Sequence, residues 1–246
     1  MLSPPHHLAS AATRLAAVVA VLATLTGCQA MVSSTSSAAQ VRVVDASPDA
    51  PGIDLYQGSD GVAYNLGFGD ITSYVPIAPG VYTISAATAG THQVLSFAKP
   101  TFAAAGQYTV LIGNTAGNLQ QLTLKDQSLP APAGQTALRF IDEATRTGPV
   151  DIYMVPSGRS LVTVNPILTN VAFGANTGYQ SIPSGTYTLV VLPTGAVPTG
   201  IAAASYTGAQ ITYPSTAART LIFIDQPLPA IAGLRVITAA DYDSPS

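Results

Sequence analysis

The sequence predicts an all-β protein, with two tandem immunoglobulin-like or transthyretin-like β-sandwich domains after a lipoprotein signal peptide. Three observations predict this fold. Short runs of β-branched and aromatic residues are separated by glycine- and proline-rich turns. The body of the chain repeats itself. The 19 prolines and 21 glycines argue against long helices, because proline removes a backbone donor and breaks a helix interior.

The first element is an export signal. Residues 15–26 are apolar but too short to span a hydrocarbon core of ~30 Å, and Arg14 is the one Lys or Arg before them. These are the features of a secretory signal peptide. Leu25, Thr26 and Gly27 precede Cys28, the chain's single cysteine, and together they resemble the bacterial lipoprotein box. We therefore expect residues 1–27 to be removed. The alternative is an ordinary signal peptide with an incidental cysteine.

The lipoprotein box implies that Cys28 carries a diacylglycerol and a fatty acyl group, such as palmitate. Two or more chains give the stable membrane anchoring that one chain does not. Gln29 follows, and a residue other than Asp at this place implies sorting to the outer membrane, if the host has one. Residues 28–40 are rich in Ser and Ala and are expected to form a flexible tether.

Composition excludes several other classes. With 9 Lys and Arg against 12 Asp and Glu, the net charge is −3, so the chain lacks the basic face that nucleic acid binding requires. One cysteine cannot form an internal disulfide, and one Cys with three His offers little for a zinc site. No cofactor is expected beyond the lipid on Cys28.

The repeat divides the body into two copies. Residues 65–84 align with residues 170–189 at nine identities in twenty positions. Upstream blocks are offset by 97 residues and these blocks by 105, so the second copy carries eight extra residues between Pro156 and Pro166. We expect domains at 41–126 and 137–243 with a linker at 127–136. The sequence does not identify the last strand of each domain, because residues 126–134 also resemble residues 225–233, which gives a different alignment.

Alternation predicts the strands of the first copy. They are expected at residues 41–47, 53–57, 81–86, 92–97, 108–113 and 119–124. Gly80 and Gly185 are expected to supply positive φ before Tyr82 and Tyr187, whose rings would face inward while the hydroxyls reach a backbone partner. The same structural role is expected for the repeated pairs Phe68/Phe173 and Tyr74/Tyr179, rather than sugar stacking.

Acidic residues form the most prominent candidate site. Asp45, Asp49 and Asp54 lie in one loop, and calcium takes several oxygen ligands from one loop. The spacing is not that of an EF-hand, and in the second copy Arg146 replaces Asp49 although Glu143 adds an acid. The structural interpretation is favoured, and any calcium site is expected in the first copy alone. Asp45/Asp142 and Asp54/Asp151 would cap turns and pair with Arg42/Arg139.

Enzyme signatures are sparse. The sequence holds no Gly-x-Ser-x-Gly elbow, phosphate loop or His-Glu-x-x-His. A hydrolase would have to be built on Asp45, Asp49, Asp54 and His92. We expect a protein that is not an enzyme.

Three segments of the chain resemble the domain of unknown function 4397 family. They are residues 41–56, Phe68-Gly69 and residues 79–82. The second copy keeps Arg139, residues 151–153, Phe173 and residues 185–187. The resemblance implies a β-sandwich and an exported bacterial or archaeal protein, often a lipoprotein with tandem copies, and it implies no activity. Relatives commonly carry His at the positions of Asp45 and Asp142.

Together these features indicate a membrane-anchored, non-catalytic binding or structural module of the cell envelope. The expected partner is an envelope protein, recognised through an apolar patch or open edge strand. The alternative partner is a glycan, bound by tyrosines outside the repeated pairs, namely Tyr64, Tyr206 or Tyr213.

Overall fold

The structure is a computed structural model that describes residues 37–199, 204–229 and 233–243. The expected signal peptide, Cys28 and nearly all of the tether lie outside the described residues. Every element described below belongs to one compact unit of the chain.

The all-β prediction is confirmed, because apart from two short 3-10 turns the regular elements of the described residues are strands. The first ten strands are β1 (Ala39–Asp45), β2 (Ile53–Gln57), β3 (Asp60–Leu66), β4 (Val75–Ile77), β5 (Gly80–Val81), β6 (Ile84–Thr88), β7 (Val94–Ala98), β8 (Thr101–Phe102), β9 (Gln107–Gly113) and β10 (Gln120–Lys125). The others are β11 (Gln135–Asp142), β12 (Val150–Pro156), β13 (Leu168–Val171), β14 (Asn176–Pro183), β15 (Gly185–Pro193), β16 (Tyr206–Tyr213), β17 (Ala218–Asp225) and β18 (Leu234–Tyr242). The 3-10 turns are η1 (Ala116–Asn118) and η2 (Leu161–Thr163). No helix of the described part of the chain has the length and hydropathy needed to cross a membrane.

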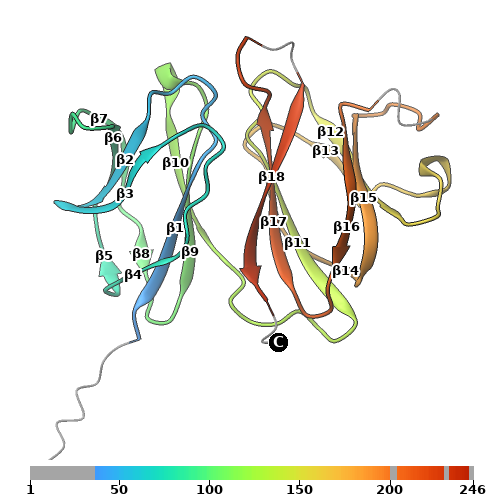
Figure 1. The fold of residues 1–246 in the computed structure, drawn as a ribbon, viewed down its shortest axis with the longest axis horizontal. Coiled ribbons are helices and arrows are strands. Elements are labelled where there is room, and N and C mark those ends of the chain that lie inside the picture. The colour runs from blue at the N-terminus through green and yellow to red at the C-terminus, as the bar shows by residue number, and fades with distance from the viewer. Residues whose placement is uncertain (1–36, 200–203, 230–232, 244–246) are drawn as a thin grey trace, which may run out of the picture. The chain divides into compact units, whose positions relative to one another are not determined.

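The strands form two halves with matching sheets, which we call the N-terminal half (residues 39–126) and the C-terminal half (residues 135–242) (Figure 1). The N-terminal half contains the sheets β10-β9-β1-β4 and β3-β2-β6-β7, with a small β5-β8 pair. The C-terminal half contains the sheets β18-β17-β11-β14 and β13-β12-β15-β16. In each half the first strand pairs in parallel with the penultimate strand, β1 with β9 and β11 with β17.

The topology identifies the last strand of each half. β10 pairs with β9, and β18 pairs with β17, at the same edge of corresponding sheets. Residues 126–134 therefore follow the last strand of the N-terminal half, whereas residues 225–233 lie between β17 and β18. Their sequence similarity does not reflect equivalent places in the fold.

Each half encloses its own apolar core between its two main sheets. In the N-terminal half, Val41 and Val43 of β1 pack with Ile53 and Leu55 of β2. In the C-terminal half, Leu138 and Phe140 of β11 take part in the corresponding core; the other members include Ile152, Val191, Leu221 and Phe223.

A third apolar cluster joins the halves. Val44 and Leu111 of the N-terminal half pack with Ile141, Ile222 and Ile224 of the C-terminal half. Strands β1 and β11 are thus buried on both faces, because successive side chains of a strand point to opposite sides. One face lines the core of its own half, and the other faces the neighbouring half. Every residue of β1 except Gln40, and every residue of β11 except Gln135, is accordingly buried.

The predicted strands lie close to the observed ones, with one interruption. The strand expected at residues 53–57 coincides with β2. The strand expected at residues 81–86 is divided into β5 and β6, with Tyr82 and Thr83 between them. Gly80 has a φ of +152°, but Gly185 is not among the residues with positive φ, so that expectation was wrong for the second copy.

Candidate functional site

The carboxylates of the candidate calcium loop do not converge. Asp45 is buried, and its Oδ1 accepts the backbone N–H of Ser47 at 2.9 Å. Asp49 Oδ1 accepts the N–H of Ala116 at the start of η1, at 2.8 Å. Within residues 37–199, 204–229 and 233–243, no three His, Cys, Asp or Glu side chains are grouped so that they could hold a metal ion.

Asp54 of β2 forms hydrogen bonds with β3 and with the turn between β6 and β7. Its Oδ1 accepts the N–H of Asn65 at 2.8 Å, and its Oδ2 accepts the N–H of Gly90 at 2.9 Å and the hydroxyl of Tyr56 at 3.2 Å. The hydrogen bonds from Gly90 and Asn65 lower the pKa of Asp54. Asp54 therefore has a structural role that uses both of its oxygens.

The C-terminal half repeats both arrangements. Asp142 Oδ1 accepts the N–H of Ala144 at 2.9 Å, two residues on, as Asp45 does with Ser47. Asp151 accepts the N–H of Asn170 at 2.9 Å and that of Gly195 at 3.0 Å, as Asp54 does with Asn65 and Gly90. The predicted turn-capping role of these aspartates is observed in both halves.

The predicted pairing of Arg42 with the loop aspartates is wrong. Arg42 projects from β1 on the side of Val44, toward the C-terminal half. Its Nη2 forms an ion pair with Asp241, and its Nη1 donates to the carbonyl of Ala240 at 2.8 Å. Its guanidinium also lies 4.9 Å from the centroid of the Tyr74 ring. Sequence neighbours such as Asp45 are not its partners, because the side chain points away from its own loop.

Arg139 of the C-terminal half makes the corresponding contacts with the N-terminal half. Its Nη2 forms an ion pair with Asp126 of the N-terminal half, and its Nη1 donates to the carbonyl of Lys125 at 3.2 Å. Its guanidinium lies 4.8 Å from the centroid of the Tyr179 ring. Each arginine therefore binds the aspartate that follows or ends the last strand of the other half.

Threonine and tyrosine hydroxyls complete the network. Asp126 Oδ2 accepts the hydroxyls of Thr109 and Tyr74, both at 2.7 Å. Asp241 Oδ2 accepts those of Thr220 at 2.7 Å and Tyr179 at 2.9 Å. The arginine Nε atoms donate to the same two threonines. We call these eight residues the crossed arginine network: Arg42, Tyr74, Thr109, Asp126, Arg139, Tyr179, Thr220 and Asp241.

Burial and charge act together in this network. The side chains of Asp126 and Asp241 are fully buried. Burial lowers the pKa of Arg42, but the carboxylates of Asp126 and Asp241 outweigh that effect and raise the pKa above its usual value. Burial, and then the charge of Asp126, raises the pKa of Tyr74. Burial, and then the charge of Asp241, likewise raises the pKa of Tyr179. Arg42 is therefore held charged and the two tyrosines are held neutral, which fits a structural connection.

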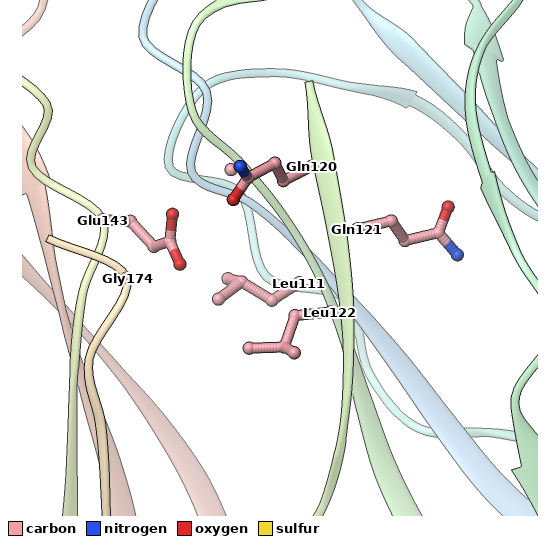
Figure 2. A pocket seen from close by; sticks show the side chains of 7 residues that line it. Leu111, Gln120, Gln121, Leu122, Glu143 and Gly174 are labelled. Atoms are coloured by element: carbon pink, nitrogen blue, oxygen red, sulfur yellow. The ribbon is translucent and has the colours of Figure 1, made fainter. Parts of the chain in front are cut away.

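A pocket of about 330 Å³ lies beside Glu143, where β9 and β10 approach the C-terminal half. Figure 2 shows the Glu143 carboxylate directed toward Leu111 and Gln120, whereas Gln121 points away. Burial and the charge of Asp142 raise the pKa of Glu143 to about 7.

Among the remaining candidates, His92 and Tyr64 both lie beside Tyr56, whereas Tyr206 and Tyr213 belong to the C-terminal half. His92 lies in the loop before β7 with a φ of +54°, and its ring centroid is 5.0 Å from that of Tyr56. Tyr64 is 65% exposed, whereas Tyr213 is 4% exposed and belongs to the core of the C-terminal half. Tyr206 is half-buried against that core. Of the three tyrosines considered for glycan binding, Tyr64 alone presents most of its surface.

The hydroxyls of the repeated Tyr82 and Tyr187 behave as the sequence predicts. Tyr187 donates to the carbonyl of Pro183 at 2.9 Å, and Tyr82 donates to that of Pro79 at 3.4 Å. Both rings pack against the cores of their halves. The pair Tyr74/Tyr179 is also structural, but its place is the crossed arginine network.

The sequence of this chain matches one family model. Residues 39–153 match the family described as "Domain of unknown function (DUF4397)", so the resemblance seen in the sequence is confirmed over these residues. The match covers the N-terminal half and continues into β12. No curated protein matches the chain.

Two solved structures are distantly similar. One is described as "Crystal structure of CBMbc (family CBM26) from Eubacterium rectale Amy13K in Complex with Maltoheptaose", with 11% identity over 84% of this chain and 98% of that chain, at a TM-score of 0.25. The other is "The Bacillus anthracis TIE protein", with 10% identity over 83% of this chain and 44% of that chain, at a TM-score of 0.23. Likenesses at these TM-scores carry no argument about ligand or activity.

Proposed function

We propose that this protein is a non-catalytic binding or structural module of the cell envelope, in which two copies of one β-sandwich domain form a rigid unit. The crossed arginine network carries this proposal. Its residues occupy matching places in the two halves, and each half supplies the buried carboxylate that the other half's arginine needs. A movement that separated the halves would break the ion pairs Arg42–Asp241 and Arg139–Asp126, and leaving such buried charges unpaired would cost several kcal/mol of free energy.

The contacts of the hydrolase candidates support a non-catalytic role. Asp45, Asp49 and Asp54 each accept a different backbone N–H, and Asp54 uses both of its oxygens for structure. A general acid or base must lie within hydrogen-bond reach of the proton that it transfers. The hydrogen bonds of these three aspartates go to backbone N–H groups of separate segments, and Asp54 also accepts one from the Tyr56 hydroxyl.

Anchoring through Cys28 is part of the proposal. Residues 1–27 would be the signal peptide, Cys28 would carry the diacylglycerol and fatty acyl groups, and Gln29 would direct the protein to the outer membrane. The test is metabolic labelling of the full chain with radioactive palmitate, followed by membrane fractionation. Label should enter the wild-type chain and be absent from Cys28→Ala. The Gln29→Asp variant should keep the label and move to the inner membrane. Labelling of Cys28→Ala would contradict the anchor.

Glycan binding is the second candidate function. Tyr64 favours it, because this tyrosine lies outside the repeated pairs and is 65% exposed. Exposed aromatic rings of this kind bind the apolar faces of other molecules while their hydroxyl stays in water.

A further inference from the structure

The outer face of the sheet β3-β2-β6-β7 carries a cluster of aromatic side chains. Ile53, Leu55 and Ile84 of this sheet point into the core of the N-terminal half. Because side chains alternate along a strand, the intervening residues point outward. We call the outward-facing set the aromatic face, and it consists of Asp54, Tyr56, Gly61, Tyr64, Ser85, His92 and Phe97.

The Tyr64 ring occupies space that is free because Gly61, in the same strand, has no side chain. A Cβ atom built on Gly61 would lie 1.7 Å from the Tyr64 hydroxyl oxygen, so the glycine makes room for the ring. The ring centroid lies 6.1 Å from that of Tyr56, at an interplanar angle of 85°. Tyr64 therefore has a defined position although 65% of its surface is exposed.

Strand register places a small polar residue between two aromatic ones. Tyr56 is directly opposite Ser85, and Ser85 is directly opposite Phe97 on the edge strand β7. Neighbouring strands lie about 4.8 Å apart, so Tyr56 and Phe97 flank the serine hydroxyl. Phe97 is 67% exposed. The row thus combines rings for stacking with hydroxyl groups for hydrogen bonding.

The strands of the aromatic face, β2, β3, β6 and β7, carry no Lys or Arg side chain. Both oxygens of Asp54 are occupied by the N–H groups of Asn65 and Gly90 and by the Tyr56 hydroxyl. An anionic ligand would find no counter-charge on these strands, whereas a neutral ligand with apolar faces and hydroxyl groups would be complementary to the rings and hydroxyls of this face.

The corresponding face of the C-terminal half is covered by its own chain. Tyr153, which matches Tyr56 in the repeat, is 4% exposed and packs with Leu161, Val190 and Leu192 in a separate apolar cluster. Leu161 belongs to η2, in the stretch where the second copy has its extra residues. Tyr56 is also only 9% exposed, but the rings beside it are those of His92 and of Tyr64, which is 65% exposed. An exposed ring therefore lies on this surface in the N-terminal half, whereas an apolar cluster occupies it in the C-terminal half.

We propose that the aromatic face binds a neutral oligosaccharide, with sugar rings stacked on Tyr64 and Phe97 and sugar hydroxyls bonded to Ser85 and Tyr64. This proposal rests on the second candidate function and assigns its site and ligand class. The C-terminal half takes no part, because Leu161 of η2 and other apolar residues pack on its equivalent tyrosine.

The test is isothermal titration calorimetry of the full chain, solubilised in a detergent without a sugar headgroup. Maltohexaose, cellohexaose and chitohexaose are the probes. At least one should bind, and the Tyr64→Ala and Phe97→Ala variants should each weaken that binding about tenfold or more. Tyr64→Phe should keep the larger part of the affinity, since it retains the ring. Phe173→Ala is the matched control, because Phe173 is an exposed aromatic residue of the other half and its removal should leave the affinity unchanged.

Two outcomes would overturn the assignment. One is the failure of all three oligosaccharides to bind at millimolar concentration, and the other is binding that persists in Tyr64→Ala and Phe97→Ala. Circular dichroism shows that each variant is folded before titration. Palmitate labelling of Cys28 is measured independently, so a failed titration would remove the glycan ligand and leave the anchored module in place.

Discussion

Arg42 and Asp241 are 199 residues apart in sequence and form a buried ion pair that joins the first strand of the N-terminal half to the last strand of the C-terminal half. Arg139 and Asp126 form the reciprocal pair. This crossed arrangement requires both halves to be present and correctly placed. It explains why two similar sandwiches in one chain would act as one rigid body.

Removing one buried carboxylate charge should destabilise the whole unit. In Asp126→Asn, Arg139 is left buried without its counter-charge, and the free energy of unfolding should fall by about 3 to 5 kcal/mol. In Asp241→Asn the loss should be smaller, because Arg42 keeps Asp126 at 3.6 Å. Urea unfolding followed by far-ultraviolet circular dichroism measures the loss. Asp243→Asn is the control, because the Asp243 side chain is 60% exposed in its pair with Arg219 and the change should cost ~1 kcal/mol or less. Equal losses in all three variants would contradict the importance of the buried pairs.

The two tyrosines of the network should have equal effects. Tyr74→Phe and Tyr179→Phe each remove one hydroxyl that donates to a buried carboxylate. We expect each variant to lose about 1.5 to 3 kcal/mol, the usual range for a hydrogen bond to a charged group. Tyr187→Phe removes an exposed hydroxyl bond to Pro183 and should lose ~1 kcal/mol or less. Clearly different losses of unfolding free energy in Tyr74→Phe and Tyr179→Phe would contradict the equivalence of the two tyrosines.

Stability should decrease as pH rises through neutrality. Burial raises the pKa of Asp45 to about 7 and that of Asp142 to about 6, and Glu143 lies at about 7. In the unfolded chain these groups titrate near pH 4, so between about pH 4 and pH 7 the folded state binds more protons. Their contribution is therefore complete below pH 4 and is lost as pH rises to about 7.

Urea unfolding at pH 5 and pH 8 measures this dependence. The free energy of unfolding should be lower at pH 8 by about 2 kcal/mol or more. In Asp45→Asn combined with Glu143→Gln, the difference should become smaller, because neutral amides remain at both positions. A wild-type protein that is more stable at pH 8 than at pH 5 would show that these carboxyl groups are not held protonated.

Gly61 should matter for binding and little for stability. In Gly61→Ala the new methyl group would occupy the place of the Tyr64 hydroxyl and displace the ring. Because the displaced atom is the end of an exposed side chain, the free energy of unfolding should change by less than about 1 kcal/mol. Oligosaccharide affinity should nevertheless fall about as far as in Tyr64→Ala. Gly58→Ala is less suitable as a control, since Gly58 has a φ of +61°. Gly117→Ala meets no atom within 4 Å and should leave both properties unchanged.

Much of the fold could be predicted because it depends on local pattern. Alternation and turn residues located β2 and β9, and the repeat revealed the equivalence of Tyr74 with Tyr179. The role of that pair could not be predicted, because its partners Asp126 and Asp241 lie beyond the aligned blocks. The sequence also suggested the wrong equivalent for Asp126, since Asp225 has a similar sequence after it.

The aromatic face could not be predicted from the sequence, because it depends on contacts between distant segments of the chain. Nothing local distinguishes Tyr64, which is exposed, from Tyr213, which is buried in the C-terminal half. The closure of the second outer face was signalled by the extra residues near Pro156, but their packing over Tyr153 required the structure. Period-two alternation would have shown that Arg42 and Asp45, three residues apart, point to opposite sides of a strand.

Differential scanning calorimetry of the full chain tests the central claim, that the crossed arginine network makes the two halves one cooperative unit. The account predicts a single transition in which the calorimetric and van't Hoff enthalpies agree. It also predicts that Asp126→Asn combined with Asp241→Asn separates this transition into two. Two independent transitions in the wild-type chain would contradict the claim and would make the halves separate domains that only touch.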